Sequence, residues 1–112
     1  MLSLSPATRV FLWLKPVDGR KSFNGLYTLV KEGFEQDPTS GHLFVFLNRR
    51  FNRLKILFWD GSGLVLCTKR LEQGTFARFK APGSSCSLRP EELQSLMHGV
   101  EGSPRKRWYR TE

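Results

Sequence analysis

The sequence has few cysteines and no cluster of residues that would bind a metal ion. Cys67 and Cys86 are the only cysteines among 112 residues, and they form neither a C-x-x-C pair nor a dense disulfide framework. Cys67 stands in an apolar run, and we interpret it as a small core residue in a reducing compartment, with a structural disulfide as the alternative. His42 and His98 lack cysteine or carboxylate partners at ligand spacing. We therefore predict no bound metal and no other cofactor.

Motifs of the common enzyme classes are also absent. The sequence contains no G-x-S-x-G, P-loop, G-x-G-x-x-G or H-E-x-x-H pattern. Four carboxylates stand in loops or at element ends, and their spacing does not bring them together on one divalent ion: Asp18, Asp37, Asp60 and Glu72. We predict that the protein is not an enzyme. The alternative is a metal-dependent nuclease, whose cleavage of DNA would be lost in Asp60→Asn.

Long hydrophobic runs are missing as well. No apolar run approaches the roughly 18 to 20 residues that a membrane span needs. The N-terminus has no basic region before its apolar stretch, which disfavours a secretory signal. We expect a cytoplasmic protein, associated with the nucleoid if it binds DNA, with no membrane partner and no small-molecule ligand.

Acidic residues are few relative to basic ones. There are 10 Asp and Glu against 18 Lys and Arg, which gives a formal net charge of +8 and a pI of about 10.1. A positive field of this size attracts phosphate-rich or otherwise acidic partners. From the charge alone, nucleic acid is the leading partner, and an acidic protein surface or an anionic membrane ranks behind it.

Apolar periodicity predicts one folded domain over residues 1–102, followed by a basic tail at 103–112. The strands are expected in short runs of apolar residues that alternate with turns, at 9–14, 43–47, 54–59, 64–68 and 75–79. Apolar residues spaced by three and four predict a helix over about 19–35, and Pro90 opens a second helix that stops at Gly99 or Gly102. The serine-rich stretch 81–87 is expected to be a flexible loop. The fold class is therefore α+β, with an antiparallel sheet of about four or five strands, largely a β-meander.

Basic residues gather in or beside the predicted turns. We predict that eight of them bind nucleic acid: Arg20, Lys21, Arg49, Arg50, Arg53, Lys55, Lys69 and Arg70. Lysine and arginine at such places contact phosphates, which positions nucleic acid without reading its sequence. Arg20 and Lys21 are expected to be secondary contacts. The alternative for the group around Arg49 is a solvated hairpin tip.

Four segments together resemble a known family. They are PVDGRKSFNGL at 16–26, DPTSGHLFVF at 37–46, RLKILFWDGSGL at 53–64 and KRLEQGTF at 69–76. In this order and at these separations they resemble the TnpB-type accessory protein of the IS-sixty-six family of bacterial insertion sequences. The RNA-guided nuclease that is also called TnpB is a different and far longer protein.

The resemblance implies an accessory protein without catalytic activity, encoded beside a transposase and needed for efficient transposition. We predict that it binds the DNA of the transposon ends through its basic surface and acts with the transposase of the same element. A protein-only interaction module that binds the transposase is the alternative.

Overall fold

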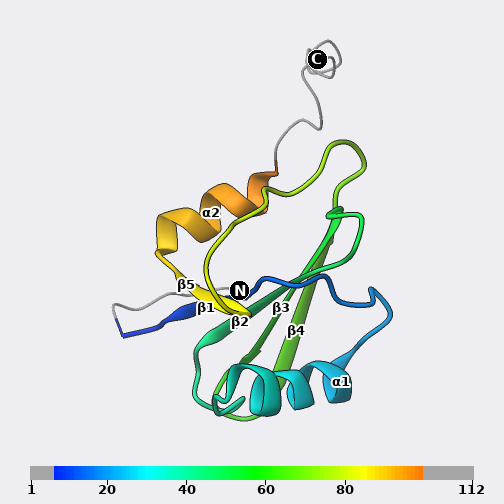
Figure 1. Cartoon of the computed structure of the whole chain (residues 1–112). Coiled ribbons are helices and arrows are strands. Elements are labelled where there is room, and N and C mark those ends of the chain that lie inside the picture. The colour runs from blue at the N-terminus through cyan, green and yellow to red at the C-terminus, as the bar shows by residue number, and fades with distance from the viewer. Residues whose placement is uncertain (1–6, 100–112) are drawn as a thin grey trace.

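Short apolar strands alternate with polar turns and two helical segments along the chain. The computed structural model describes residues 7–99, so the predicted basic tail at 103–112 lies outside the described residues. The strands are β1 (Val10–Trp13), β2 (Leu43–Leu47), β3 (Arg53–Trp59), β4 (Leu64–Arg70) and β5 (Ser85–Leu88). The helices are α1 (Phe23–Thr28), which continues as the π-helix η1 (Leu29–Phe34), and α2 (Pro90–His98) (Figure 1). The predicted α+β class is confirmed, with one helix after the first strand and one after the last.

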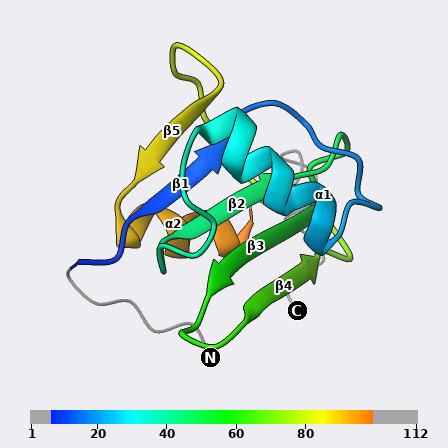
Figure 2. The same ribbon diagram turned by 90° about the horizontal axis from the view of Figure 1, so that it is seen from below.

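The five strands form a single sheet with the order β4-β3-β2-β1-β5 (Figure 2). β2, β3 and β4 follow one another as antiparallel neighbours, as the two turn signals predicted. β1 and β2 instead pair in parallel, with Val10 opposite Leu43. The reason is that α1 and η1 carry the chain back along the sheet between these strands. The sheet is therefore mixed, and this pairing differs from the antiparallel sheet that we expected.

The fifth strand lies where a loop was predicted. Residues 75–79 form no strand in the described chain: Thr75 makes an isolated bridge, and Phe76 is 1% exposed in the core. β5 comes from the stretch predicted to be a flexible loop, and it pairs antiparallel with β1, Cys86 lying opposite Leu12. The free edge of β1 offers hydrogen-bonding groups that β5 satisfies, and Leu88 is buried at its end. Both predictions for residues 75–87 were wrong.

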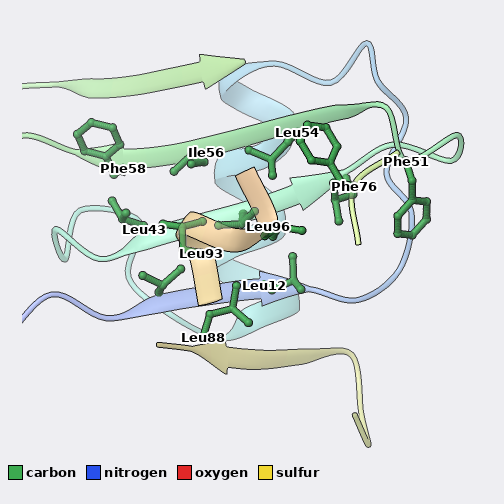
Figure 3. Close-up of a cluster of buried hydrophobic side chains, with 13 residues drawn as sticks. Leu12, Leu43, Phe51, Leu54, Ile56, Phe58, Phe76, Leu88, Leu93 and Leu96 are labelled. Atoms are coloured by element: carbon green, nitrogen blue, oxygen red, sulfur yellow. The ribbon is translucent and has the colours of Figure 1, made fainter. Parts of the chain in front are cut away.

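Each face of the sheet is covered by a helix. Leu26, Val30 and Phe34 of the first helical segment pack on one face against β2 and β3. Leu93 and Leu96 of α2 pack on the other face, over Ile56 and the leucines around it (Figure 3). All five residues of β2 are buried because this central strand has apolar neighbours on both sides. Within residues 7–99, no helix has the length and apolar character of a membrane span.

The first helix begins later than predicted. Residues 18–21 form a turn in which the Lys21 N–H donates to the Asp18 carbonyl at 3.0 Å, so the helix starts at Phe23. It ends at Glu35, whose φ of 58° is left-handed. The second helix begins at Pro90 and stops before Gly99, whose φ is 76°, as predicted. The delayed start leaves the 18–21 segment outside the helix, at one end of the sheet.

Candidate nucleic-acid interface

The topology brings the predicted basic residues to one end of the sheet. The parallel strands β1 and β2 end there, β3 begins there, and β4 ends opposite the start of β3. The turns after β1 and β2 therefore lie beside the end of β4 (Figures 1 and 2). We call this part of the molecule the basic end, defined by the eight residues predicted to bind nucleic acid: Arg20, Lys21, Arg49, Arg50, Arg53, Lys55, Lys69 and Arg70. Asp60, in the hairpin between β3 and β4, lies at the opposite end.

Arg49 and Arg50 stand at the tip of a rigid turn, residues 48–52. The side-chain oxygen of Asn48 accepts hydrogen bonds from the backbone N–H groups of Asn52 and Arg53, at 3.0 and 2.9 Å. The Asn48 amide donates in turn to the Asn52 side-chain oxygen at 2.8 Å. One side chain thus satisfies two backbone donors of the turn. Both arginines are exposed, and the turn holds their backbone in place.

Phe51 anchors the same turn in the core. Its φ of 56° lies in the left-handed region that a bulky residue rarely adopts, while its ring is only 8% exposed. The Phe51 carbonyl accepts from the Phe76 N–H at 2.7 Å, and the Arg78 guanidinium lies 4.0 Å from the centre of the Phe51 ring. The burial of the ring and these contacts offset the backbone strain. Our sequence prediction missed both Asn48 and Phe51 as positioning residues, although an asparagine at the start of a turn is the usual signal.

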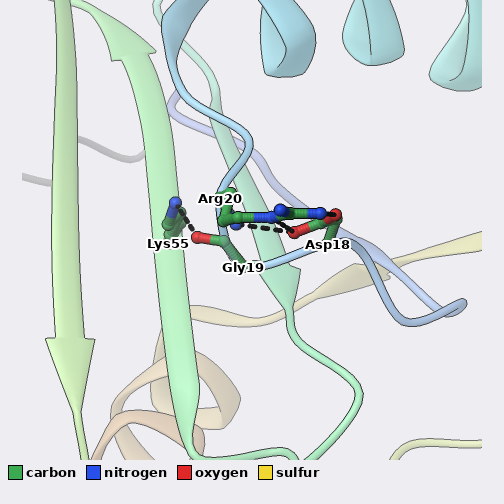
Figure 4. Close-up of polar contacts among 4 residues, drawn as sticks. All are labelled: Asp18, Gly19, Arg20 and Lys55. Atoms are coloured by element: carbon green, nitrogen blue, oxygen red, sulfur yellow. Dashed lines mark hydrogen bonds and ion pairs between the residues drawn. The ribbon is translucent and has the colours of Figure 1, made fainter.

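Asp18 and Lys55 fix the 18–21 turn on the sheet (Figure 4). The Asp18 carboxylate accepts from the Arg20 backbone N–H at 2.9 Å and forms an ion pair with the Arg20 guanidinium at 2.8 Å. The side-chain hydrogen bond from Arg20, together with the backbone one, lowers the pKa of Asp18 far below its ordinary value. The Lys55 ammonium donates to the carbonyls of Gly19 at 2.7 Å and of Lys21 at 2.5 Å. Burial, and to a lesser degree the charge of Arg53, lowers the pKa of Lys55.

Arg53 and Arg70 lie opposite one another on the neighbouring strands β3 and β4. They are register partners in β3 and β4, so their side chains leave the same face. Arg70 forms an ion pair with Glu72 at 3.0 Å. Arg53 is half-buried beside Gly19 and has no acidic partner within residues 7–99. Like charges in register repel, so this arrangement favours an anion.

Lys69 lies on the other face of the sheet. Its ammonium donates to the Met97 carbonyl at 2.8 Å, at the C-terminal end of α2. A lysine at this place satisfies a carbonyl that the helix leaves unpaired. It also borders a groove of about 620 Å³ along α2, lined mainly by residues of that helix. The eight side chains of the basic end fall into two groups. Four of them form an ion pair or a hydrogen bond within the chain: Arg20, Lys55, Lys69 and Arg70. Within the described residues, the side chains of the other four form neither: Lys21, Arg49, Arg50 and Arg53.

A small cleft separates the two turns of the basic end. It has a volume of about 290 Å³ and lies between residues 16–19 and 48–50. The turns approach closely beneath it, since a Cβ on Gly19 would lie 3.7 Å from the Asn48 Cβ. Two arginines and the paired Asp18 line the cleft, which therefore suits a small anionic group better than an apolar one.

The carboxylates that a nuclease would need do not converge. Asp60 caps its own hairpin, accepting from the N–H groups of Ser62 and Gly63 at 3.0 Å each. Asp37 accepts from the Thr39 N–H at 2.9 Å within another turn. In the part of the chain that the structure describes, no group of three or more histidine, cysteine or acidic residues could hold a metal ion. Neither Cys67 nor Cys86 forms a disulfide within residues 7–99.

Comparison with known proteins identifies the family. The model of the family described as IS66 Orf2 like protein matches residues 8–107. The chain belongs to this family. The resemblance seen in the four sequence segments is thus confirmed, and the family is one of insertion-sequence accessory proteins, associated with transposition.

Two relatives of this IS66 Orf2-like chain come from Sinorhizobium fredii (strain NBRC 101917 / NGR234). Uncharacterized protein y4jC is 37% identical over 107 residues, which cover 96% of this chain and 92% of the relative. Uncharacterized protein y4hO is 34% identical over 113 residues, covering 100% of this chain and 98% of the relative. No solved structure matches the chain significantly.

Proposed function

We propose that this IS66 Orf2-like protein is a non-catalytic, DNA-associated accessory factor that acts with the transposase of its insertion sequence. It contacts DNA through the basic end, by binding backbone phosphates. The observation that carries the proposal is that separate segments bring eight basic side chains to one end of the sheet, and that four of them make neither an ion pair nor a side-chain hydrogen bond within residues 7–99.

The main phosphate contacts are the four side chains that make no ion pair or hydrogen bond within the described residues: Lys21, Arg49, Arg50 and Arg53. Arg49 and Arg50 are exposed on a turn that is already ordered, so binding immobilises little additional backbone. Lys21 ends the neighbouring 18–21 turn, and Arg53 lies beside Gly19 of the same turn. Guanidinium groups bind phosphate oxygens in a bidentate manner, which orients the DNA as well as holding it. Arg20, Lys69 and Arg70 are secondary contacts, because each must share its charge with a partner inside the chain.

The mechanism predicts a defined dependence on salt. Each phosphate that is neutralised on duplex DNA contributes about 0.9 to the slope of log K against log salt concentration. Four contacts therefore give a slope of about 4, and the secondary contacts would raise it. Phosphate contacts carry no base information, so affinity for transposon-end DNA and for random DNA should be similar without the transposase.

The test is a titration of transposon-end and random duplex DNA, with and without the transposase. The variant Arg49→Gln/Arg50→Gln should bind more weakly, with a slope smaller by about 2. The matched control is Arg9→Gln/Lys31→Gln, which removes the same charge from exposed residues away from the basic end and should leave the slope unchanged. Equal losses in both variants would mean that net charge alone attracts the DNA, and absence of binding at low salt would refute the proposal.

Experiments with the same protein, transposase and DNA distinguish two alternative functions. Transposase capture that survives charge reversal at Arg49, Arg50 and Arg53, without DNA binding by the wild type, would identify a protein-only interaction module. Magnesium-dependent cleavage of DNA that is lost in Asp60→Asn would identify a nuclease.

A further inference from the structure

Phe23 is the one exposed large apolar side chain within residues 7–99. Its side chain is 43% exposed at the start of α1, whereas the other phenylalanines are buried or half-buried. No aromatic ring in the described chain contacts it. A single exposed apolar residue is common on protein surfaces and needs no explanation by itself. What distinguishes Phe23 is its position, two residues after Lys21 and beside the basic end.

Hydrogen bonds fix the backbone of the segment that carries Lys21 and Phe23. The Lys21 carbonyl accepts from the Lys55 ammonium, and the Lys21 N–H donates to the Asp18 carbonyl at 3.0 Å. The helix fixes the other side, since the Leu26 N–H donates to the Ser22 carbonyl at 3.0 Å. A cation and an aromatic ring are therefore presented to solvent, two residues apart, on a short segment whose backbone is fixed at both ends.

This combination matches the chemistry of an unpaired nucleotide. Proteins that bind single strands combine cations that follow the phosphates with aromatic rings on which the bases stack. In an intact duplex the base faces are covered by their neighbours, so an exposed ring gains little there unless a base step is opened. A ring beside a phosphate-binding surface thus favours DNA that has free base faces.

We propose that Lys21 and Phe23 bind an unpaired nucleotide of the DNA, with the ring stacked on the base and the ammonium on the adjoining phosphate. The inference rests on the proposed function, since it uses the same basic end. It adds a preference for DNA with single-stranded segments over fully paired duplex. Lys55 acts here as a positioning residue, because it holds the segment without touching the nucleotide.

The experiment measures affinity by fluorescence anisotropy for a single strand, a blunt duplex and a duplex with a single-stranded overhang. Phe23→Ala should weaken binding to the single strand and to the overhang about 5- to 150-fold, the effect of losing one stacked base. Binding to the blunt duplex should not change. Because the ring is uncharged, the salt slope of Phe23→Ala should equal that of the wild type, whereas Lys21→Gln should lower the single-strand slope by about 0.7.

Two further variants control for folding and for the ring itself. Phe23→Tyr keeps an aromatic face and should bind single strands like the wild type. Asn24→Ala changes the next exposed residue of α1 and should have no effect. Equal single-strand affinity of Phe23→Ala and the wild type, or a loss in Phe23→Tyr as large as in Phe23→Ala, would overturn the inference. Duplex binding would then still support the proposed function, whereas failure to bind any of the three DNA forms would overturn both.

Discussion

Replacing Lys55 by methionine tests whether this residue holds the 18–21 turn. The methionine keeps an unbranched apolar stem but removes both hydrogen bonds, to the Gly19 carbonyl at 2.7 Å and to the Lys21 carbonyl at 2.5 Å. A hydrogen bond to a charged group contributes about 1.5 to 3 kcal/mol when it is shielded from water. The ammonium of Lys55 is only partly buried, and its lowered pKa indicates that burial opposes its charge. We therefore expect Lys55→Met to lower the free energy of unfolding by about 1 to 2 kcal/mol in total.

The loss should be visible in two measurements. Urea denaturation should give a lower midpoint with an unchanged m-value, and each kcal/mol should lower Tm by about 4 to 8 °C. Amide hydrogen exchange should speed up at the Lys21 N–H, which lies in the turn, by more than in α2. Lys31→Met is the matched control, because Lys31 is exposed on η1 and should tolerate the change within about 0.5 kcal/mol.

A DNA titration separates positioning from direct contact. If Lys55 acts through the turn, the effects of Lys55→Met and Lys21→Gln on affinity should not add, since both act on the same segment. Additive effects, with a salt slope lowered by about 0.9 in Lys55→Met, would show that Lys55 itself neutralises a phosphate, as its sequence position predicted. Unchanged stability and unchanged exchange at Lys21 would refute the role of Lys55 in holding the turn.

Other contacts give equally direct predictions. Asn48→Ala leaves two backbone donors of the 48–52 turn without a partner and should lower the free energy of unfolding by about 1 to 3 kcal/mol, whereas Asn24→Ala should not. Leu96→Ala removes a fully buried side chain and should lower the free energy of unfolding by about 2 to 5 kcal/mol, as measured by chemical denaturation. A substitution at the exposed Gln94 of the same helix is the control. Backbone hydrogen bonds lower the pKa of Asp60, so its stabilising effect is present above the ordinary carboxyl pKa and is lost as pH falls through the lowered value. Stability should therefore fall less steeply below about pH 4 in Asp60→Asn than in the wild type, as measured by acid titration of Tm.

The strands that sequence patterns predicted are those whose apolar residues lie between clear turns. β2, β3 and β4 follow this rule, and the Asp60 hairpin joins two of them. β5 does not, because an edge strand needs backbone hydrogen bonds more than apolar side chains, and its serines resemble those of a loop. The parallel pairing of β1 with β2 depends on where α1 packs, which local patterns do not specify.

The basic end was predictable in composition but not in detail. Clusters of lysine and arginine beside turns predicted which segments carry the charge. The roles of single residues depend on partners far away in the chain: Lys55 reaches a carbonyl 36 residues away, and Lys69 one 28 residues away. Both acceptors are backbone carbonyls, which every residue has, so no sequence pattern points to them.

The place of β1 in the sheet also determines when the sheet can be completed. β1 leaves the ribosome first, yet it lies between β2 and β5, and β5 extends to Leu88. The hairpins of β2, β3 and β4 can form from neighbouring residues, whereas the pairing of Val10 with Leu88 closes a loop of nearly the whole described chain. A nascent chain therefore carries a first strand with one open edge until almost all of the domain has been synthesised. We expect slow final closure of the sheet, and sensitivity of the newly made protein to anything that competes for that edge.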